Sequence, residues 1–597
     1  MRRAKIVCTL GPASSSIRVI EDLVEAGMAV ARINASHTDA ERISTIAHTV
    51  REVDSRVEVP VATMLDLQGP EIRTLPADEP VNLTAGASVA FQPGGRTDAG
   101  VIGLSRAIRN VRRGDRILID DGRIACTVAA VDGETVTAEV EIGGILGDRK
   151  GINVPGVDLD LPMVTEKDRE DLSVLTEGTI DFVAASFVRD EEDVLEVNAA
   201  IEALDCDVPI IAKIERADAV ENLADILDTT YGVMVARGDL GVECPLEQIP
   251  MMQKRIIRRC REDGIPVITA TEMLDSMVSA RRPTRAEASD VANAVLDGTD
   301  AVMLSEETAV GDHPVRVVEA MDGIVREVEA SDEYAELREQ RIPPAARSRT
   351  DALARAGRYY ARDIGAHVLI ATSETGYTAR KAAKYRPAMP IVAGTLSERI
   401  SRRLTISWGL QPYLIDPSEP TATELIEEAV SVTLEHDLAE SGDTVVVITG
   451  MMREIEGAEF TNTLKVHVAA ETVTTGRVVV GGVVTGPLWF TDDGDVSEIE
   501  PGSILVIDDD FDAEIRGDLD AIAGIVSAED GLTGYVAMIA REMGVPMISS
   551  AAVPASIEAG RIVTLDAERG VLYGGDISTP SLMEERSQTD PAIRLDR

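Results

Sequence analysis

The chain has few cysteines and no long apolar segment. Its five cysteines, Cys8, Cys126, Cys206, Cys244 and Cys260, show neither Cys-x-x-Cys spacing nor an even-numbered framework, so we expect buried free thiols of a reducing cytoplasm. The longest apolar runs, such as Val478–Gly486, are far shorter than the roughly 20 residues that span a bilayer. No apolar stretch as long as a signal-peptide core follows the basic amino terminus, which argues against a signal peptide. These absences predict a soluble intracellular protein.

Lysine is also scarce. Only eight of the 58 basic residues are lysines, and 104 acidic residues give a formal net charge of −46. A surface this acidic repels the phosphates of nucleic acids and anionic membranes, so neither is an expected partner. Because the excess is spread along the whole chain, the composition resembles that of halophilic, archaeal-like proteins in molar KCl, where the Debye length is ~3 Å. An ordinary acidic mesophilic protein is the alternative.

Short apolar runs dominate the first half of the chain, and helical patterns follow most of them. Their apolar character on both faces is typical of strands in a buried parallel sheet. The runs are Lys5–Leu10, Ala29–Asn34, Val61–Leu67, Phe182–Phe187, Ile210–Ile214, Gly232–Ala236, Val267–Ala270 and Ala301–Leu304. Eight strand–helix units predict an α/β fold built on a (β/α)8 TIM barrel.

The other stretches predict three smaller domains. Residues 70–155, rich in Val, Thr, Gly and Asp with a tight turn at 131–134, indicate a small all-β insertion that divides the barrel into 1–69 and 156–339. Helix–strand alternation over 350–470 indicates an open α/β domain. Residues 476–575, with one strong helix at Tyr535–Met543, form a fourth α/β domain, and the tail from Asp576 is expected to be loose.

Charged and hydroxyl residues follow the predicted barrel strands, where barrel enzymes place their catalytic groups. Glu215 and Asp239, two carboxylates without a nearby His or Cys, suit a hard divalent cation such as Mg2+. Arg32 offers a planar fork for a phosphate. Lys213 suits the stabilisation of charge on a transferring phosphoryl group. A rim of structural ion pairs is the alternative for any one residue, but the strand ends taken together favour phosphoryl transfer.

Five motifs stand in the order in which the pyruvate kinase family carries them. They are KIVCTLGPAS at 5–14, GPEIR at 69–73, KIE at 213–215, MVARGDLG at 234–241 and RPTRAE at 282–287. Over residues 1–470 the chain therefore resembles that family. The resemblance implies a lid domain at 70–155, a regulatory domain at 350–470, and transfer of the phosphoryl group of phosphoenolpyruvate to ADP, giving pyruvate and ATP in the last step of glycolysis. It also implies Mg2+ (or Mn2+) and K+ as cofactors and a cytoplasmic homotetramer.

The resemblance also assigns roles to individual residues. The implied catalytic residues are Lys213, Arg32 and Thr271, and the implied substrate ligands are Arg32, Lys213, Gly238, Asp239 and Thr271. The implied Mg2+ ligands are Glu215 and Asp239, and the implied K+ ligands are Asn34, Ser36, Asp66 and the carbonyl of Leu67. The implied nucleotide contacts are Asn34, His37, Arg73 and Lys150. An implied sugar-phosphate effector loop contains Thr372, Ser373, Thr375, Gly376 and Thr378, with a plain helix cap as the alternative.

Three positions bear on how the enzyme would work. Glu71 is the residue by which the chain resembles the K+-dependent branch of the family. A lysine at this position would itself supply the positive charge that K+ brings. Gln68 stands where the family commonly has lysine, and Glu306 replaces a glycine. Because neither departure touches the expected ligands, we expect activity with altered kinetics.

The last domain resembles the swivelling phosphohistidine domain of phosphoenolpyruvate-using enzymes. Tyr535 stands where that domain carries its histidine, and no histidine follows His467. Tyrosine, with a pKa near 10, is a poor phosphoryl acceptor, so a structural, oligomerising or regulatory role is expected. The alternatives for the whole chain are a synthase or dikinase with a phosphohistidine shuttle, and an inactive paralogue that only binds partners. Tyr535 argues against the first, and the intact strand-end residues argue against the second.

Overall fold

The structure is a computed structural model that describes residues 2–77, 79–98, 100–344, 348–417, 421–451, 460–509 and 511–577. The chain forms two compact units. Unit 1 contains Met1–Ser348, Ala379–Arg386 and Ser397–Pro412, and unit 2 contains Arg349–Thr378, Pro387–Leu396 and Tyr413–Arg597. The tail that we expect to be loose lies largely outside the described residues.

Unit 1 is built on a closed barrel of eight parallel strands in the order β1-β17-β16-β15-β14-β13-β3-β2. The strands are β1 Lys5–Leu10, β2 Val30–Asn34, β3 Ala62–Asp66, β13 Phe182–Ala185, β14 Ile210–Ile214, β15 Gly232–Ala236, β16 Val267–Ala270 and β17 Ala301–Leu304. They coincide with the eight predicted apolar runs to within two residues at either end. The predicted α/β fold class and TIM barrel are confirmed.

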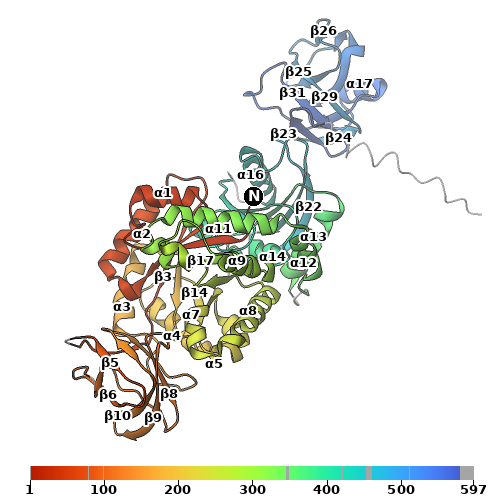
Figure 1. The fold of residues 1–597 in the computed structure, drawn as a ribbon. Helices are drawn as coiled ribbons and strands as arrows, with labels where there is room; N and C mark the ends of the chain where they lie inside the picture. The colour runs from red at the N-terminus through yellow and green to blue at the C-terminus, as the bar shows by residue number, and fades with distance from the viewer. Residues whose placement is uncertain are drawn as a thin grey trace, which may run out of the picture. The chain divides into compact units, whose positions relative to one another are not determined.

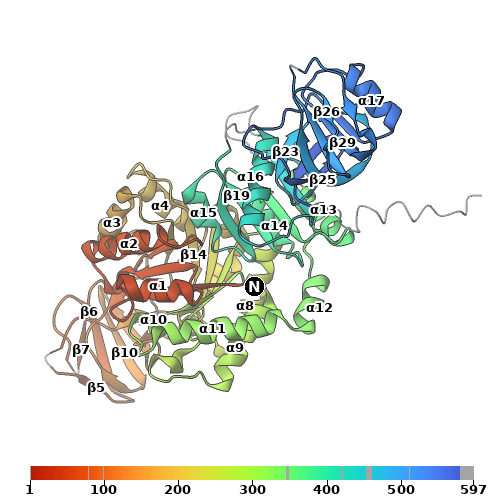
Figure 2. The ribbon, with the colours of Figure 1, turned by 90° about the horizontal axis from the view of Figure 1, so that it is seen from above.

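Helices surround these strands (Figures 1 and 2). They include α1 Ile17–Glu25, α2 Ala40–Asp54, α4 Glu191–Glu202, α6 Leu223–Thr229, α8 Ile249–Asp263, α9 Arg285–Asp297 and α11 Pro314–Glu329. Helix α2 shows the local logic: the Asp39 side chain accepts a hydrogen bond from Arg42 N and so caps the first turn. Ile43, Ile46 and Val50 then recur at helical spacing and are buried.

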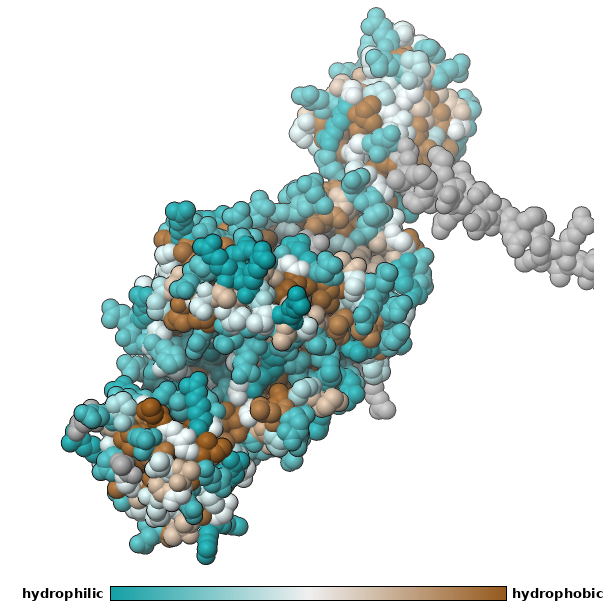
Figure 3. Space-filling view, in the orientation of Figure 1, coloured by the Kyte–Doolittle hydropathy of each residue, from teal (hydrophilic) through white to brown (hydrophobic). Residues whose placement is uncertain are grey.

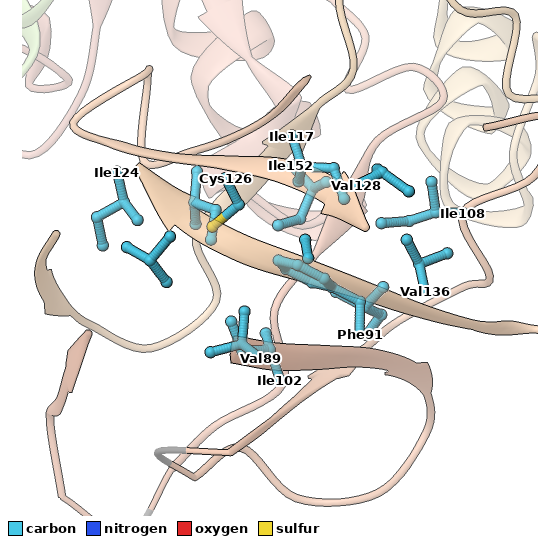
Figure 4. Close-up of a cluster of buried hydrophobic side chains, with 14 of the residues drawn as sticks. Val89, Phe91, Ile102, Ile108, Ile117, Ile124, Cys126, Val128, Val136 and Ile152 are labelled. Carbon is cyan, nitrogen blue, oxygen red and sulfur yellow. The ribbon is translucent and has the colours of Figure 1, made fainter. Parts of the chain in front are cut away.

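The insertion between β3 and α3 (Glu166–Leu172) is all-β. Its main sheet has the order β4-β12-β8-β9-β10-β6-β7. These strands are β4 Ile72–Arg73, β6 Ser88–Pro93, β7 Val101–Leu104, β8 Arg116–Ile119, β9 Ile124–Asp132, β10 Thr135–Ile142 and β12 Gly151–Asn153. A tight turn is present one residue later than predicted, over 132–135, because Asp132 pairs with Thr135 and Gly133 has a φ of 61°. Figure 4 shows Phe91 among the buried aliphatic side chains of this domain.

The first half of unit 2 contains most of a five-stranded sheet in the order β20-β19-β18-β21-β22. The strands are β18 Val368–Thr372, β19 Ile391–Thr395, β20 Leu410–Leu414, β21 Thr444–Met451 and β22 Phe460–Val468. β18 pairs in parallel with β19 and β21, whereas β22 runs antiparallel to β21. Helices α13 (Arg349–Asp363), α14 (Tyr377–Lys384) and α16 (Ala422–Glu435) complete the α/β alternation.

The last part of unit 2 is an eight-stranded mixed sheet in the order β23-β32-β31-β25-β27-β29-β30-β24. The strands are β23 Thr472–Thr475, β24 Arg477–Val480, β25 Val483–Phe490, β27 Ser503–Ile507, β29 Ile522–Ser527, β30 Met547–Ser549, β31 Ile562–Asp566 and β32 Val571–Gly574. Its helix α17, Tyr535–Met543, has the predicted bounds. Among the described residues, no helix of either unit is long and apolar enough to cross a membrane.

Candidate active site

The predicted catalytic residues and metal ligands lie at one rim of the barrel. Arg32 lies on β2 and Asp66 ends β3. Lys213 is the penultimate residue of β14, and Glu215 directly follows that strand. Gly238 and Asp239 belong to α7 (Arg237–Glu243), which follows β15, and Thr271 follows β16. Because all eight strands are parallel, their carboxyl ends meet on the same side of the barrel.

Lys213 lies at the centre of a network of charges. Its Nζ atom is 3.2 Å from Asp66 Oδ1 and 2.8 Å from Glu215 Oε1. It also donates a 2.7 Å hydrogen bond to Ser186 Oγ. Burial disfavours the charged ammonium, but these carboxylates outweigh that effect and raise the pKa of Lys213. Lys213 is therefore a fixed positive charge at neutral pH.

Arg32 supplies a second buried cation. Its Nε donates to Asp66 Oδ2 at 2.6 Å, and its Nη1 donates to Thr9 Oγ1 at 2.8 Å. Burial would raise the pKa of Asp66, but Lys213 and Arg32 together lower it. Asp66 is thus an ionised carboxylate that holds two cations side by side, which suits the binding of a dianionic phosphoryl group.

Glu215 and Asp239 form an acidic pair beside these cations. Burial is the main cause that raises the pKa of each carboxyl, and the charge of Asp239 raises the pKa of Glu215 further. Lys213 opposes both shifts. Burial and mutual repulsion destabilise the ionised forms of these two carboxylates. Their hard oxygens therefore fit a divalent cation. Within the described residues, no group of three or more His, Cys, Asp and Glu side chains could hold a metal ion, so a cation here would take further ligands from substrate or water.

Thr271 has a strained backbone. Its φ is 62° and that of the following Glu272 is 53°. A β-branched residue at positive φ is an outlier that costs on the order of 1–3 kcal/mol and persists where the surroundings enforce it. Thr271 Oγ1 accepts a 2.8 Å hydrogen bond from Gly238 N and donates to Ala270 O at 2.7 Å. The strain places the hydroxyl against the first turn of α7.

The four predicted K+ ligands come from two neighbouring strands. Asn34 and Asp66 are register partners on β2 and β3. Ser36 follows in the short helix Ala35–His37, where Ser36 N donates to Asn34 Oδ1 at 3.1 Å. Leu67 O accepts a 2.7 Å hydrogen bond from Ser186 Oγ. The oxygens are the right kind for a monovalent cation, and several already hold protein partners.

The predicted nucleotide contacts are divided between the barrel and the β insertion. His37 ends the short helix after β2. Arg73 pairs with Glu71 at 2.6 Å, and Lys150 Nζ lies 2.8 Å from Asp120 Oδ1. Both insertion cations are therefore neutralised by carboxylates of the same domain. A cavity of about 80 Å3 lies between barrel and insertion, lined by residues that include Glu71, Asp121, Phe187, Asp239 and Glu243.

Ser186 and Phe187 are site residues that the sequence reasoning missed. Ser186 Oγ bridges Lys213 and the Leu67 carbonyl, and Phe187 N donates to Glu215 Oε2 at 2.7 Å. Both directly follow β13. A polar residue at the end of that apolar run is the signal that would have identified Ser186.

The two departures from the family pattern lie at the edge of this network. Gln68 Nε2 donates to Glu71 Oε2 at 3.2 Å, so it binds the carboxylate that also holds Arg73. Glu306 begins α10 (Glu306–Ala309) after β17 and its side chain is exposed. Neither contacts Lys213, Glu215 or Thr271 in the hydrogen bonds and ion pairs of the described residues.

The predicted effector loop connects β18 to α14. Thr372 Oγ1 donates to Thr449 Oγ1 at 2.6 Å. Ser373 Oγ accepts from Thr378 N at 3.3 Å, and Thr375 Oγ1 accepts from Tyr377 N at 3.4 Å. Gly376 has a φ of 79°. The hydroxyls of Ser373 and Thr375 thus bind backbone N–H groups at the start of α14, as a helix cap does.

Tyr535 begins helix α17 of the last domain. Its hydroxyl accepts a 3.1 Å hydrogen bond from Ile515 N. A Cβ atom built on the preceding Gly534 would lie 2.7 Å from Glu529 Oε1, so the carboxylate of Glu529 lies against the start of this helix. A carboxylate of the chain itself thus lies beside the helix terminus, where it opposes the approach of a phosphate.

This parallel barrel, with buried cations and carboxylates at its carboxyl rim, defines a TIM-barrel enzyme. Residues 1–318 match the family described as pyruvate kinase, barrel domain, and residues 351–467 match pyruvate kinase, alpha/beta domain. Residues 499–570 match PEP-utilising enzyme, mobile domain. The chain belongs to the pyruvate kinase family.

Individual relatives agree along nearly the whole chain. The pyruvate kinase of Sporosarcina psychrophila is 38% identical over 587 residues, covering 97% of this chain and 100% of that protein. The pyruvate kinase of Geobacillus stearothermophilus is 39% identical over 588 residues, covering 97% and 99%. A solved pyruvate kinase from Cryptosporidium parvum aligns with a TM-score of 0.73 and 34% identity, covering 78% of this chain and 96% of that one. The two full-length relatives are bacterial, so the halophilic, archaeal-like interpretation of the composition stays a prediction.

Proposed function

We propose that this chain is an active pyruvate kinase, which transfers the phosphoryl group of phosphoenolpyruvate to ADP and releases pyruvate and ATP. The observation that carries the proposal is the network around Lys213, in which two buried cations and two buried carboxylates, Asp66 and Glu215, converge at the carboxyl ends of parallel strands. Such a network is costly in a merely structural rim, because each buried charge must be desolvated.

In the proposed mechanism, Arg32 and Lys213 bind the transferring phosphoryl group. Both are buried and both are oriented by Asp66, so their charges need no reorganisation when the phosphoryl group leaves its donor oxygen. Lys213 stabilises the negative charge of the transition state, and this preorganised electrostatic effect supplies most of the rate enhancement.

Glu215 and Asp239 hold Mg2+ or Mn2+ in this proposal. When bound, the divalent cation offsets the negative charge of the enolate that remains after phosphoryl transfer. The amides of Gly238 and Asp239, with the hydroxyl of Thr271, hold the substrate carboxylate at the start of α7. Thr271 Oγ1 already lies 2.8 Å from Gly238 N, and it is placed to organise the proton transfer that turns the enolate into pyruvate.

We assign K+ to Asn34, Ser36, Asp66 and the Leu67 carbonyl, and the nucleotide to Asn34, His37, Arg73 and Lys150. Arg73 and Lys150 pair with Glu71 and Asp120 in this structure. Nucleotide phosphates would replace these carboxylates as partners, so nucleotide binding and rearrangement of the insertion would be coupled. Through this exchange of partners the insertion would act as a lid over the site.

We further propose a cytoplasmic homotetramer that binds neither nucleic acid nor membranes. The unpaired state of all five cysteines and the net charge of −46 support this setting. The last domain is proposed to be structural or regulatory, because Tyr535 and Glu529 occupy the helix start that a phosphoryl carrier needs.

The test is a coupled assay for pyruvate from phosphoenolpyruvate and ADP, in molar KCl with Mg2+ and then with NaCl in place of KCl. Activity in KCl that collapses in NaCl supports the reaction and the K+ site together. Activity in both salts keeps the reaction and rejects the K+ assignment. A folded protein with no activity in either salt rejects the proposal in favour of an inactive paralogue.

A further inference from the structure

Two consecutive residues after β16 have left-handed backbones. Thr271 and Glu272, with φ of 62° and 53°, are the pair that carries the proposed substrate-binding hydroxyl. A backbone of this kind needs outside contacts to hold it. Three of these contacts come from one side chain, that of Arg237.

The Arg237 guanidinium binds the carbonyls of three successive residues. Its Nε donates to Ala270 O at 3.1 Å. Its Nη2 donates to Thr271 O at 2.6 Å and to Glu272 O at 3.2 Å. The planar fork of donors therefore follows the turn of the strained segment, carbonyl by carbonyl.

The remaining edge of the guanidinium anchors this fork to the barrel helices. Nη1 lies 2.6 Å from Asp290 Oδ2 on α9 and 3.5 Å from Gln253 Oε1 on α8. Arg237 is only 9% exposed, so Asp290 balances a charge that would otherwise be buried alone. The strained segment is thereby tied to two helices outside the catalytic rim.

Arg237 and its neighbour Gly238 hold Thr271 from two sides. The side chain of Arg237 binds the Thr271 carbonyl, and the backbone N of Gly238 binds the Thr271 hydroxyl at 2.8 Å. The two contacts come from adjacent residues at the start of α7, so they close a small ring of bonds around Thr271. A shift of Arg237 would turn the hydroxyl away from the place where the substrate carboxylate is proposed to bind.

We propose that Arg237 is a positioning residue that sets the orientation of the Thr271 hydroxyl, and that it acts on turnover only through Thr271. The inference rests on the proposed function. Lysine cannot replace Arg237, because one ammonium nitrogen cannot reach three carbonyls and Asp290 with the geometry of a planar fork.

The test is a double-mutant cycle with Arg237→Lys and Thr271→Ala, measured as kcat and as KM for phosphoenolpyruvate. In the parent background we expect Arg237→Lys to lower kcat about tenfold or more, since small misplacements of reacting groups are costly. In the Thr271→Ala background the same change should cost less than about twofold, because the group it positions is gone. An equal loss in both backgrounds overturns the proposal.

Arg51→Lys is the matched control. Arg51 binds Val61 O, Thr179 O and Asp181, which precede the amino ends of β3 and β13, whereas Thr271 follows the carboxyl end of β16. Its replacement should lower stability, and any loss of kcat should be equal in both backgrounds. If Arg237→Lys does not fold, Asp290→Asn replaces it in the cycle, and again an equal loss in both backgrounds overturns the proposal. An inactive but folded parent protein would reject the proposed function itself, which is a separate outcome.

Discussion

Lys213 is a buried ammonium whose charge depends on its neighbours. An isolated buried lysine tends to lose its proton, but Asp66 and Glu215 raise the pKa of this one. We predict that Lys213→Met lowers kcat by about 10²–10³-fold or more, because a preorganised charge is lost from the transition state. The coupled pyruvate assay measures it. Lys254→Met is the control, since Lys254 pairs with Asp297 on a barrel helix; a near-normal rate for Lys213→Met would remove this residue from the mechanism.

The Glu71 carboxylate accepts hydrogen bonds from the side chains of Arg73 and Gln68. We predict that Glu71→Lys lowers the dependence of activity on K+, because an ammonium there supplies the positive charge that the monovalent cation would bring. The ratio of rates in KCl and NaCl measures the effect. Glu79→Lys makes the same charge change at an exposed position of the insertion and should leave the ratio as in the parent. A Glu71→Lys variant that needs K+ as strongly as the parent contradicts the site assignment.

At the scale of elements, the RPTRAE motif acts as a capping box. Thr284 caps α9: its hydroxyl accepts from Glu287 N, and the Glu287 carboxylate accepts from Thr284 N. We predict that Thr284→Ala lowers the free energy of unfolding by about 1 kcal/mol. Urea unfolding measures it, and Thr45→Ala at an exposed position of α2 should change stability by less than about 0.5 kcal/mol.

The same capping box has a pH dependence. Burial opposes ionisation of Glu287, but hydrogen bonds from Ser276 and Thr284 outweigh it and lower its pKa. The unfolded chain therefore binds more protons than the folded one at pH values around the lowered and the usual glutamate pKa. The stabilisation is present above the usual glutamate pKa, near 4.3, and is lost as the pH falls through the lowered value. A stability loss for Glu287→Gln that persists unchanged at pH 3 would contradict this assignment.

The last domain is joined to the α/β domain within unit 2 by a small apolar contact. Val468 and Ala470 cluster with Tyr573 and Ile577, while β23 pairs with β32 inside the last domain. We predict that a chain ending at Glu471 keeps measurable pyruvate kinase activity, because the proposed catalytic residues lie in unit 1. Steady-state kinetics of the truncated chain, measured alongside the full-length chain, test this prediction. Loss of all activity from a truncated chain with intact circular dichroism would give the last domain a catalytic role.

At the scale of the whole molecule, the net negative charge sets how stability depends on salt. Hydrophilic side chains cover most of the face that Figure 3 shows, and the net charge is −46. We predict that the thermal midpoint rises as KCl increases from ~0.1 M to molar concentrations, because screening shortens the Debye length from ~10 Å to ~3 Å. Melting curves in KCl and in NaCl separate general screening, which both salts supply, from K+ binding. A midpoint that does not depend on salt would contradict the salt-adapted interpretation.

Local patterns in the sequence account for the elements of the fold. Apolar runs such as Ile210–Ile214 are strands because every side chain on them is buried, and an Asp132-Gly133-Glu134-Thr135 turn closes a hairpin because Gly133 tolerates positive φ. Strand ends also mark Lys213 and Thr271 as candidates, since parallel strands share one rim. These inferences need only near neighbours in the chain.

Partnerships between distant residues required the tertiary structure. The sequence by itself determined the barrel, the insertion and the rim on which the charged residues lie, because burial and periodicity are local properties of a strand or helix. Only the folded chain decided that Ser186 joins Lys213 to Leu67, that Arg73 and Lys150 pair with carboxylates of the insertion, and that Arg237 binds the Thr271 carbonyl. The reason is physical: hydrogen bonds and ion pairs depend on ångström-scale distances between side chains from different strands, which no spacing along the chain encodes.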